Sequence, residues 1–185
     1  MPTTSVQKAA EFRGDLKAFL KDYRFQPSLT ERLDRLEGID FRQDLVNEIV
    51  LWKVNRYVSV SQSLMKELDN LKILPQGEHR KSKSVLNRLL NTHGVDLPMA
   101  STFLRFRNPD VFQIIDRHAY RAVYGSPFKL YTATSTERKM DTYFMYLDEL
   151  LSLCRSRCLE FRTVDRLLYI FDKKKNGSLT SRVGG

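Results

Sequence analysis

The segment Thr92–Tyr124 constrains the fold of this chain more than any other part of its sequence. A turn at Gly94 follows an apolar helical stripe and precedes a second helix, which we expect over Leu97–Phe106. Glycine adopts a positive φ without a Cβ clash, so the two helices can form a tight hairpin. Asp116 comes 22 positions after Gly94 (116 − 94), at the end of the apolar stretch Val111–Ile115. The segment therefore predicts a helical hairpin followed by a carboxylate at the edge of an apolar environment.

The remaining sequence is typical of an all-α protein. Gly (8) and Pro (6) are too few for a turn-rich β protein, and apolar residues recur at helical spacing. In the helix expected over residues 42–56, we expect Leu45, Val46, Ile49, Val50 and Trp52 to face inward. The other helices are expected over residues 4–23, 28–36, 60–71, 82–91, 97–106, 116–124, 136–156 and 163–172.

The charge balance favours a polyanionic partner. The chain carries 31 basic and 22 acidic residues, a formal net charge of +9, and Lys and Arg side chains that neutralise phosphates release counterions. Cys154 and Cys158 are too few to hold an iron–sulfur cluster alone, and we expect reduced thiols. No apolar run reaches the roughly 18 residues that span a bilayer, and the N-terminus lacks a signal-peptide pattern. We therefore expect an intracellular, cytoplasmic or nucleoid-associated protein.

Two features of the central segment suggest a binding or catalytic site. Backbone N–H groups at the start of the helix after Gly94 and Val95 can bind a phosphate, although any tight helical hairpin also needs a glycine. Lys81 and Lys83 precede this turn, and such a basic run indicates either contact with nucleic acid or a solvated surface. Asp116 is placed to cap the next helix, and a capped carboxylate is also held rigidly enough to stabilise a developing cation.

The block Asp-Arg-His-Ala-Tyr-Arg-Ala over residues 116–122 resembles the helix-hairpin-helix DNA glycosylases, the superfamily of endonuclease III and the adenine-specific mismatch glycosylase. Gly94, Val95 and Ala100 match the hairpin of that family, and Asp116 falls at the family's distance from Gly94. The close resemblance covers residues 86 to 124. It implies a monomer with two helical lobes and an active-site cleft between them. The lobes would comprise residues 1–39 with 126–172, and residues 40–125, followed by a mobile basic tail over residues 173–185.

The resemblance also implies an activity. Asp116 would stabilise an oxocarbenium-like sugar or orient the attacking water, while Gly94 and Val95 anchor the backbone of double-stranded DNA whose target base is flipped out. The family's Schiff-base lysine is replaced by Pro98, which implies monofunctional hydrolysis. Asp96 replaces the second hairpin glycine and could repel a phosphate or cap the next helix. No metal, iron–sulfur centre or organic cofactor is implied.

Four further residues are candidates. Glu48 lies in a segment similar to the one that carries the catalytic acid of the adenine-specific branch, and it could protonate the departing base if burial raised its pKa; a solvated Glu is the alternative. Asn55 and Arg56, at the end of the same expected helix, are candidates for DNA contact. Arg121 is expected either to contact phosphate or to hold the surroundings of Asp116. Two other functions stay open: a non-catalytic helix-hairpin-helix DNA-binding protein, and a helical adaptor for an acidic protein.

Overall fold

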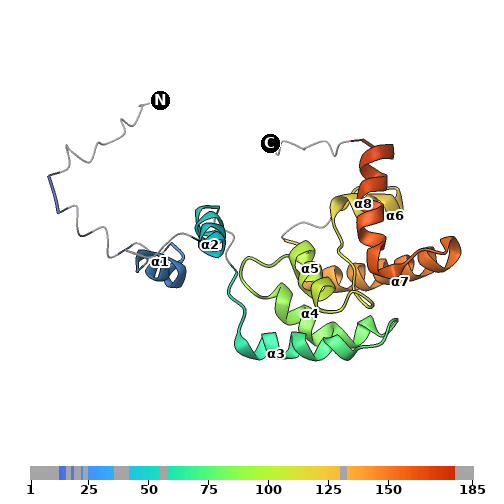
Figure 1. The fold of residues 1–185 in the computed structure, drawn as a ribbon, viewed down its shortest axis with the longest axis horizontal. Helices are drawn as coiled ribbons and strands as arrows, with labels where there is room; N and C mark the ends of the chain where they lie inside the picture. The colour runs from blue at the N-terminus through green and yellow to red at the C-terminus, as the bar shows by residue number, and fades with distance from the viewer. Residues whose placement is uncertain are drawn as a thin grey trace. The chain divides into compact units, whose positions relative to one another are not determined.

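The computed structural model describes residues 13–15, 18, 22, 25–35, 42–54, 58–129 and 133–177. All regular secondary structure in these residues is helical, which confirms the all-α class (Figure 1). None of the described helices is long and apolar enough to cross a bilayer. The helices are α1 (Pro27–Asp34), α2 (Gln43–Lys53), α3 (Gln62–Asn70), α4 (Lys83–Leu90), α5 (Leu97–Arg107), α6 (Arg117–Tyr124), α7 (Thr136–Arg157) and α8 (Val164–Lys175), with short 3-10 helices at Leu71–Ile73, His79–Ser82 and Phe161–Thr163.

The chain divides into two compact units, Met1–Tyr57 and Val58–Gly185. This boundary differs from the expected lobes, because α7 and α8 share one hydrophobic core with the helices of residues 58–125. Residues 173–175, expected to belong to the basic tail, are helical because α8 continues through Lys175, and the tail from residue 178 lies outside the described residues. The helix expected over residues 4–23 falls mostly outside the described residues.

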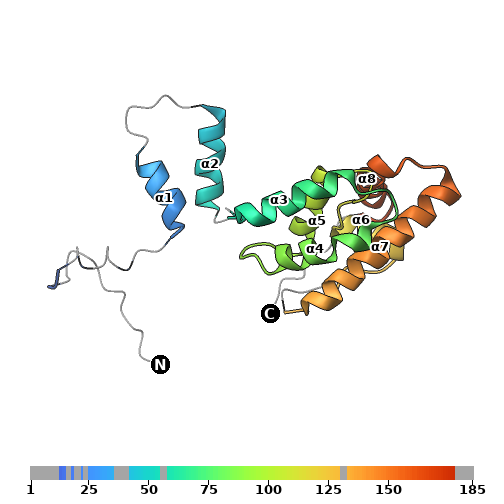
Figure 2. The same cartoon turned by 90° about the horizontal axis from the view of Figure 1, so that it is seen from below.

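The second unit is built around α7, which packs against both α4 and α6 (Figure 2). Ser135 caps α7 by accepting the Arg138 N–H, and the helix buries one face over its whole length. α4 buries Val85, Leu86 and Leu89, and Leu90 is half-buried. The largest fully buried apolar side chains of this core are Leu86, Leu89, Leu97, Leu104, Phe112, Ile115, Tyr143, Tyr146, Leu147 and Leu150.

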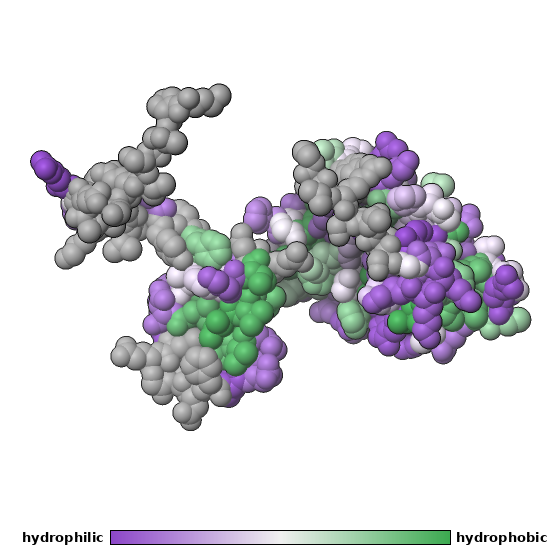
Figure 3. Space-filling view, turned by 90° about the horizontal axis from the view of Figure 1, so that it is seen from above, coloured by the Kyte–Doolittle hydropathy of each residue, from purple (hydrophilic) through white to green (hydrophobic). Residues whose placement is uncertain are grey.

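In the first unit, α2 packs against α1. Trp52 donates its indole N–H to the Thr30 hydroxyl at 2.9 Å, and Leu45 is buried. The expectation that Val46 and Val50 face inward is wrong: they are 38% and 54% exposed. Successive residues turn about 100° around a helix, so the two valines lie on a different side from Leu45 and Trp52. With Leu51 and Val54 they give α2 the apolar surface seen in Figure 3.

Candidate functional site

Asp116 is the N-cap of α6. Its backbone is extended, and its carboxylate accepts the Ala119 N–H at 2.7 Å. The residue before it, Ile115, is fully buried, whereas Asp116 itself is half-buried. The carboxylate is therefore fixed in direction by the helix that it caps and still reaches solvent.

Two tyrosines of α7 hold the irregular segment that delivers Asp116. The hydroxyl of Tyr143 donates to the Gln113 carbonyl, and that of Tyr146 donates to the Ile114 carbonyl, both at 3.0 Å. Burial raises the pKa of both phenols well above the ordinary value, so the hydroxyls stay protonated and keep donating. The backbone two residues before Asp116 is thus tied to the longest helix of the core.

The N–H groups of the same segment are also bound. Ile114 donates to the Asp165 carboxylate at 3.3 Å, and Ile115 donates to the Ser101 hydroxyl at 3.2 Å. Asp165 is only 4% exposed; it also accepts the Arg166 N–H and forms an ion pair with Arg105 at 3.5 Å. Side chains from α5, α7 and α8 therefore converge on the irregular segment that precedes Asp116.

A small pocket of about 210 Å³ opens beside Asp116. It lies between the segment before α6 and one side of α8, and its lining is mainly apolar, with two aspartates, an arginine and a tyrosine among the lining residues. Sites for drug-sized ligands usually occupy about 300–1,000 Å³, so this pocket suits a single ring-sized group. Its lining residues are Ile114, Asp116, Asp165, Arg166, Tyr169 and Ile170.

Asp172 joins α6 to α8. It is fully buried, and Arg121 grips it through Nε at 2.8 Å and Nη2 at 2.7 Å. His118 Nδ1 lies 2.7 Å from the same carboxylate, and Asn176 donates to it at 2.7 Å. These groups, Arg121 foremost, hold the pKa of Asp172 far below its usual value. Arg121, a candidate for DNA contact, is thus directed to Asp172 and is 18% exposed.

The hairpin joins α4 to α5 as expected. Gly94 has a φ of +80°, which explains the glycine, but the Val95 N–H donates to the Thr92 carbonyl at 3.0 Å. Asp96 caps α5 by accepting the Leu97 N–H at 2.7 Å, and its Oδ1 lies 2.9 Å from the Lys139 ammonium. Of the two expected roles for Asp96, capping is the one that the structure shows. The donors that would grip a phosphate at this helix start are therefore partly used within the chain.

Acidic side chains pair with most of the cations around the hairpin. Lys81 lies 2.6 Å from Glu78 and Arg80 lies 2.6 Å from Asp148. Arg88 pairs with Glu67, and Arg107 with Asp69. Lys83 is exposed at the start of α4. The basic run before the turn is therefore a surface of mixed charge.

The remaining candidates belong to the first unit. Glu48 is 21% exposed and forms an ion pair with Arg32 of α1 at 2.9 Å. Asn55 and Arg56 lie outside the described residues. The role of Glu48 as an acid and the DNA contacts of Asn55 and Arg56 stay predictions.

Sequence reasoning missed Ser101, Tyr143, Tyr146 and Asp165. The spacing of the two tyrosines, three residues apart, shows that they share one face of α7, but nothing local shows which carbonyls they meet. Within the described ranges, no group of three or more His, Cys, Asp or Glu side chains is placed to hold a metal ion.

No protein-family model, curated protein or solved structure matches the chain. The likeness to the helix-hairpin-helix glycosylases therefore rests on the motifs around Gly94 and Asp116 alone.

Proposed function

We propose that this protein is a monofunctional DNA glycosylase, which hydrolyses the N-glycosidic bond of a damaged, mismatched or modified base. The observation that carries the proposal is the placement of Asp116: a helix-capping carboxylate, rigidly supported from three other helices, on the wall of a pocket of ring size. A fixed negative charge beside an anomeric carbon stabilises the cation that forms there as the base departs.

In the proposed reaction, the bond between C1′ and the base nitrogen breaks, and the electron pair leaves with the base. Asp116 faces the electron-poor sugar, and a water molecule adds to C1′ and loses its proton. The departing base takes up a proton, with Glu48 as the candidate donor. Because Pro98 has no amine where the family's bifunctional members carry lysine, no Schiff base forms at that position, and the product is an abasic site.

The test is a panel of duplexes, each carrying a different lesion, mismatch or modified base. The enzyme is used in excess, in single turnover, and alkali reveals the abasic sites. Asp116→Asn keeps a good N-cap side chain and should slow excision by roughly 100- to 1,000-fold, the range for loss of one electrostatic group. Its melting temperature should stay close to that of the wild type.

Asp96→Asn is the matched control. It also changes an aspartate that caps a helix of the second unit, and at saturating enzyme it should leave the excision rate unchanged. Borohydride should trap no covalent complex. Equal rates for Asp116→Asn and wild type would contradict the proposal. If the wild type binds duplexes but releases none of the bases, the non-catalytic DNA-binding function takes its place.

A further inference from the structure

Apart from Asp116 at the N-cap of α6, the exposed charges of α6 and α8, the two helices beside the pocket, are all basic. α8 contains two acids, Asp165 and Asp172, and both are buried in contacts with arginines. Every exposed charged side chain on α6 and α8, which are described in full, is therefore basic: Arg117, Arg166, Lys173, Lys174 and Lys175. None of these five forms an ion pair with another residue of the described part of the chain, in contrast to most cations near the hairpin.

Two of these cations adjoin the pocket, and a third is next in sequence to a lining residue. Arg166 lines it directly. Lys173 lies over the ring of Tyr169, a lining residue, at 5.0 Å from its centroid. Arg117 follows Asp116 and lies one turn before Arg121, on the side of α6 that meets α8.

The arrangement on α8 follows from helix geometry. At about 100° per residue, Arg166 and Lys173 fall within roughly 20° of each other, on the side that also presents Tyr169 and Ile170 to the pocket. Lys174 is turned about 100° away. Seven residues of helix separate Arg166 from Lys173 by about 10 Å, which is roughly three nucleotide steps along one strand of a duplex.

The geometry points to the α6–α8 face, defined by Arg117, Arg166, Tyr169 and Lys173, as the surface that binds the backbone of the DNA strand carrying the target nucleotide. Cations flank the pocket and can contact phosphates about three nucleotide steps apart, with the target nucleotide between them. The phenol ring and the aliphatic groups between them suit a sugar or base rather than a carboxylate-rich peptide. This inference rests on the proposed function for the identity of the polyanion.

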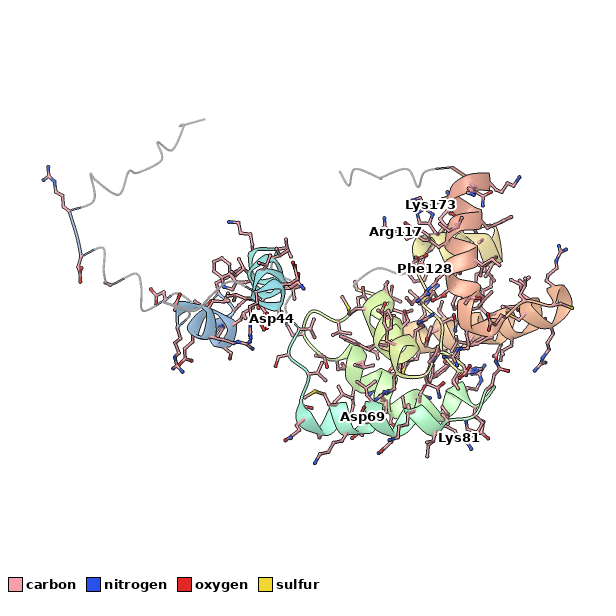
Figure 4. The ribbon with its side chains drawn as sticks, in the orientation of Figure 1. Asp44, Asp69, Lys81, Arg117, Phe128 and Lys173 are labelled. Atoms are coloured by element: carbon pink, nitrogen blue, oxygen red, sulfur yellow. The ribbon has the colours of Figure 1, made fainter. Side chains whose placement is uncertain are left out.

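This face differs from the surface predicted by the sequence. Figure 4 shows Lys81 at the opposite end of the second unit from Arg117 and Lys173. Lys81 is paired with Glu78, whereas Arg166 of the α6–α8 face lines the same pocket as Asp116. The strand is therefore expected to follow α6 and α8 rather than the basic run before the hairpin.

The test measures binding of the full chain to an undamaged labelled duplex across a range of salt concentrations. Arg166→Gln with Lys173→Gln removes two cations from the face; Lys174→Gln with Lys175→Gln removes two from the same helix at other angles. Each phosphate contact contributes about 0.9 to the slope of log K against log salt. The first pair should lower the magnitude of that slope by about 2, and the control pair should leave it nearly unchanged.

Amine-reactive footprinting of the wild type adds a readout that needs no variant. Bound duplex should protect Lys173 and leave Lys174 and Lys81 reactive. Equal effects of the two double variants, or protection of Lys81 without Lys173, would overturn the inference. So would binding of poly-glutamate or anionic lipid vesicles in preference to DNA. These measurements require no base release, so a failure of the glycosylase proposal appears separately, as absent excision with the binding result unchanged.

Discussion

At the scale of single residues, Asp172 is the point where side chains of α6 and α8 are joined. Its buried carboxylate contacts Arg121, His118 and Asn176. Asp172→Asn removes the negative charge and leaves the Arg121 guanidinium without its counter-ion. Breaking a buried ion pair in this way should lower the free energy of unfolding by about 3 kcal/mol, measured by urea denaturation near pH 7.

The same contacts predict a pH dependence. The folded-state pKa of Asp172 lies below that of the unfolded chain, so on acidification the unfolded state binds the proton first. The stabilisation is therefore complete above the ordinary carboxyl pKa of about 3.9 and is lost as pH falls below it. Urea denaturation at pH 5, 4 and 3 should show the gap between wild type and Asp172→Asn narrowing. Asp110→Asn, which removes an exposed ion pair with Arg162, serves as control, and a gap that stays constant would contradict the assignment.

At the scale of elements, α7 positions Asp116 without touching the pocket. Tyr146→Phe leaves the part-buried Ile114 carbonyl without its donor, which should cost about 1 kcal/mol of stability. A small displacement of the carboxylate should slow base release by about 10- to 100-fold. We expect kcat to fall and the affinity for duplex DNA to stay unchanged, because Tyr146 supports the protein backbone before Asp116 rather than the DNA strand.

Tyr120→Phe is the comparison for that variant. It removes the hydroxyl of a half-buried tyrosine on α6 and should leave base release close to the wild-type rate. A fall in duplex affinity with Tyr146→Phe, at unchanged kcat, would show that α7 acts through binding and not through the position of Asp116.

The helices themselves were predictable from sequence. The expected helices over residues 97–106 and 136–156 correspond to α5 and α7 within one residue at each end. Their signals are local: Asp96 and Ser135 cap them, and apolar residues recur along one face. α1 begins at Pro27, one residue before the start of the helix expected over residues 28–36.

The contacts that define the candidate site were not predictable in this way. Tyr146 and Ile114 lie 32 positions apart, and Asp172 and Arg121 lie 51 apart. Such pairs depend on how helices dock, which one sequence does not specify. Asp116 was found because its signal is local: a cap residue after an apolar run. The sequence does not reveal that both acids of α8 are buried. It therefore suggests a helix of mixed charge, whereas the exposed charges of α8 are all basic.

At the scale of the whole molecule, the second unit contains its own core. Every residue of the main hydrophobic cluster lies after Val58 or is Val58 itself. A fragment that begins at Val58 should therefore unfold cooperatively in urea, with a free energy of unfolding on the order of 5–15 kcal/mol. It lacks Glu48, Asn55 and Arg56, so under the proposed function it should bind duplex DNA yet excise little or no base.

Circular dichroism through the urea transition, together with the excision assay, checks both parts of this prediction. A gradual, non-cooperative transition would show that the first unit is needed for folding. Excision at the full-length rate would show that the first unit supplies neither the acid nor an essential DNA contact.

The ion pair between Asp96 and Lys139 holds a carboxylate of the chain at the start of α5. This carboxylate occupies the position at the start of α5 where an external anion would otherwise bind. It is covalently tethered there because it belongs to the chain itself. A tethered group acts at a high effective concentration, so a phosphate arriving in solution competes at a disadvantage. The start of α5 is therefore already occupied by a group of the chain itself, and under the proposed function we expect the DNA strand to bind at the α6–α8 face.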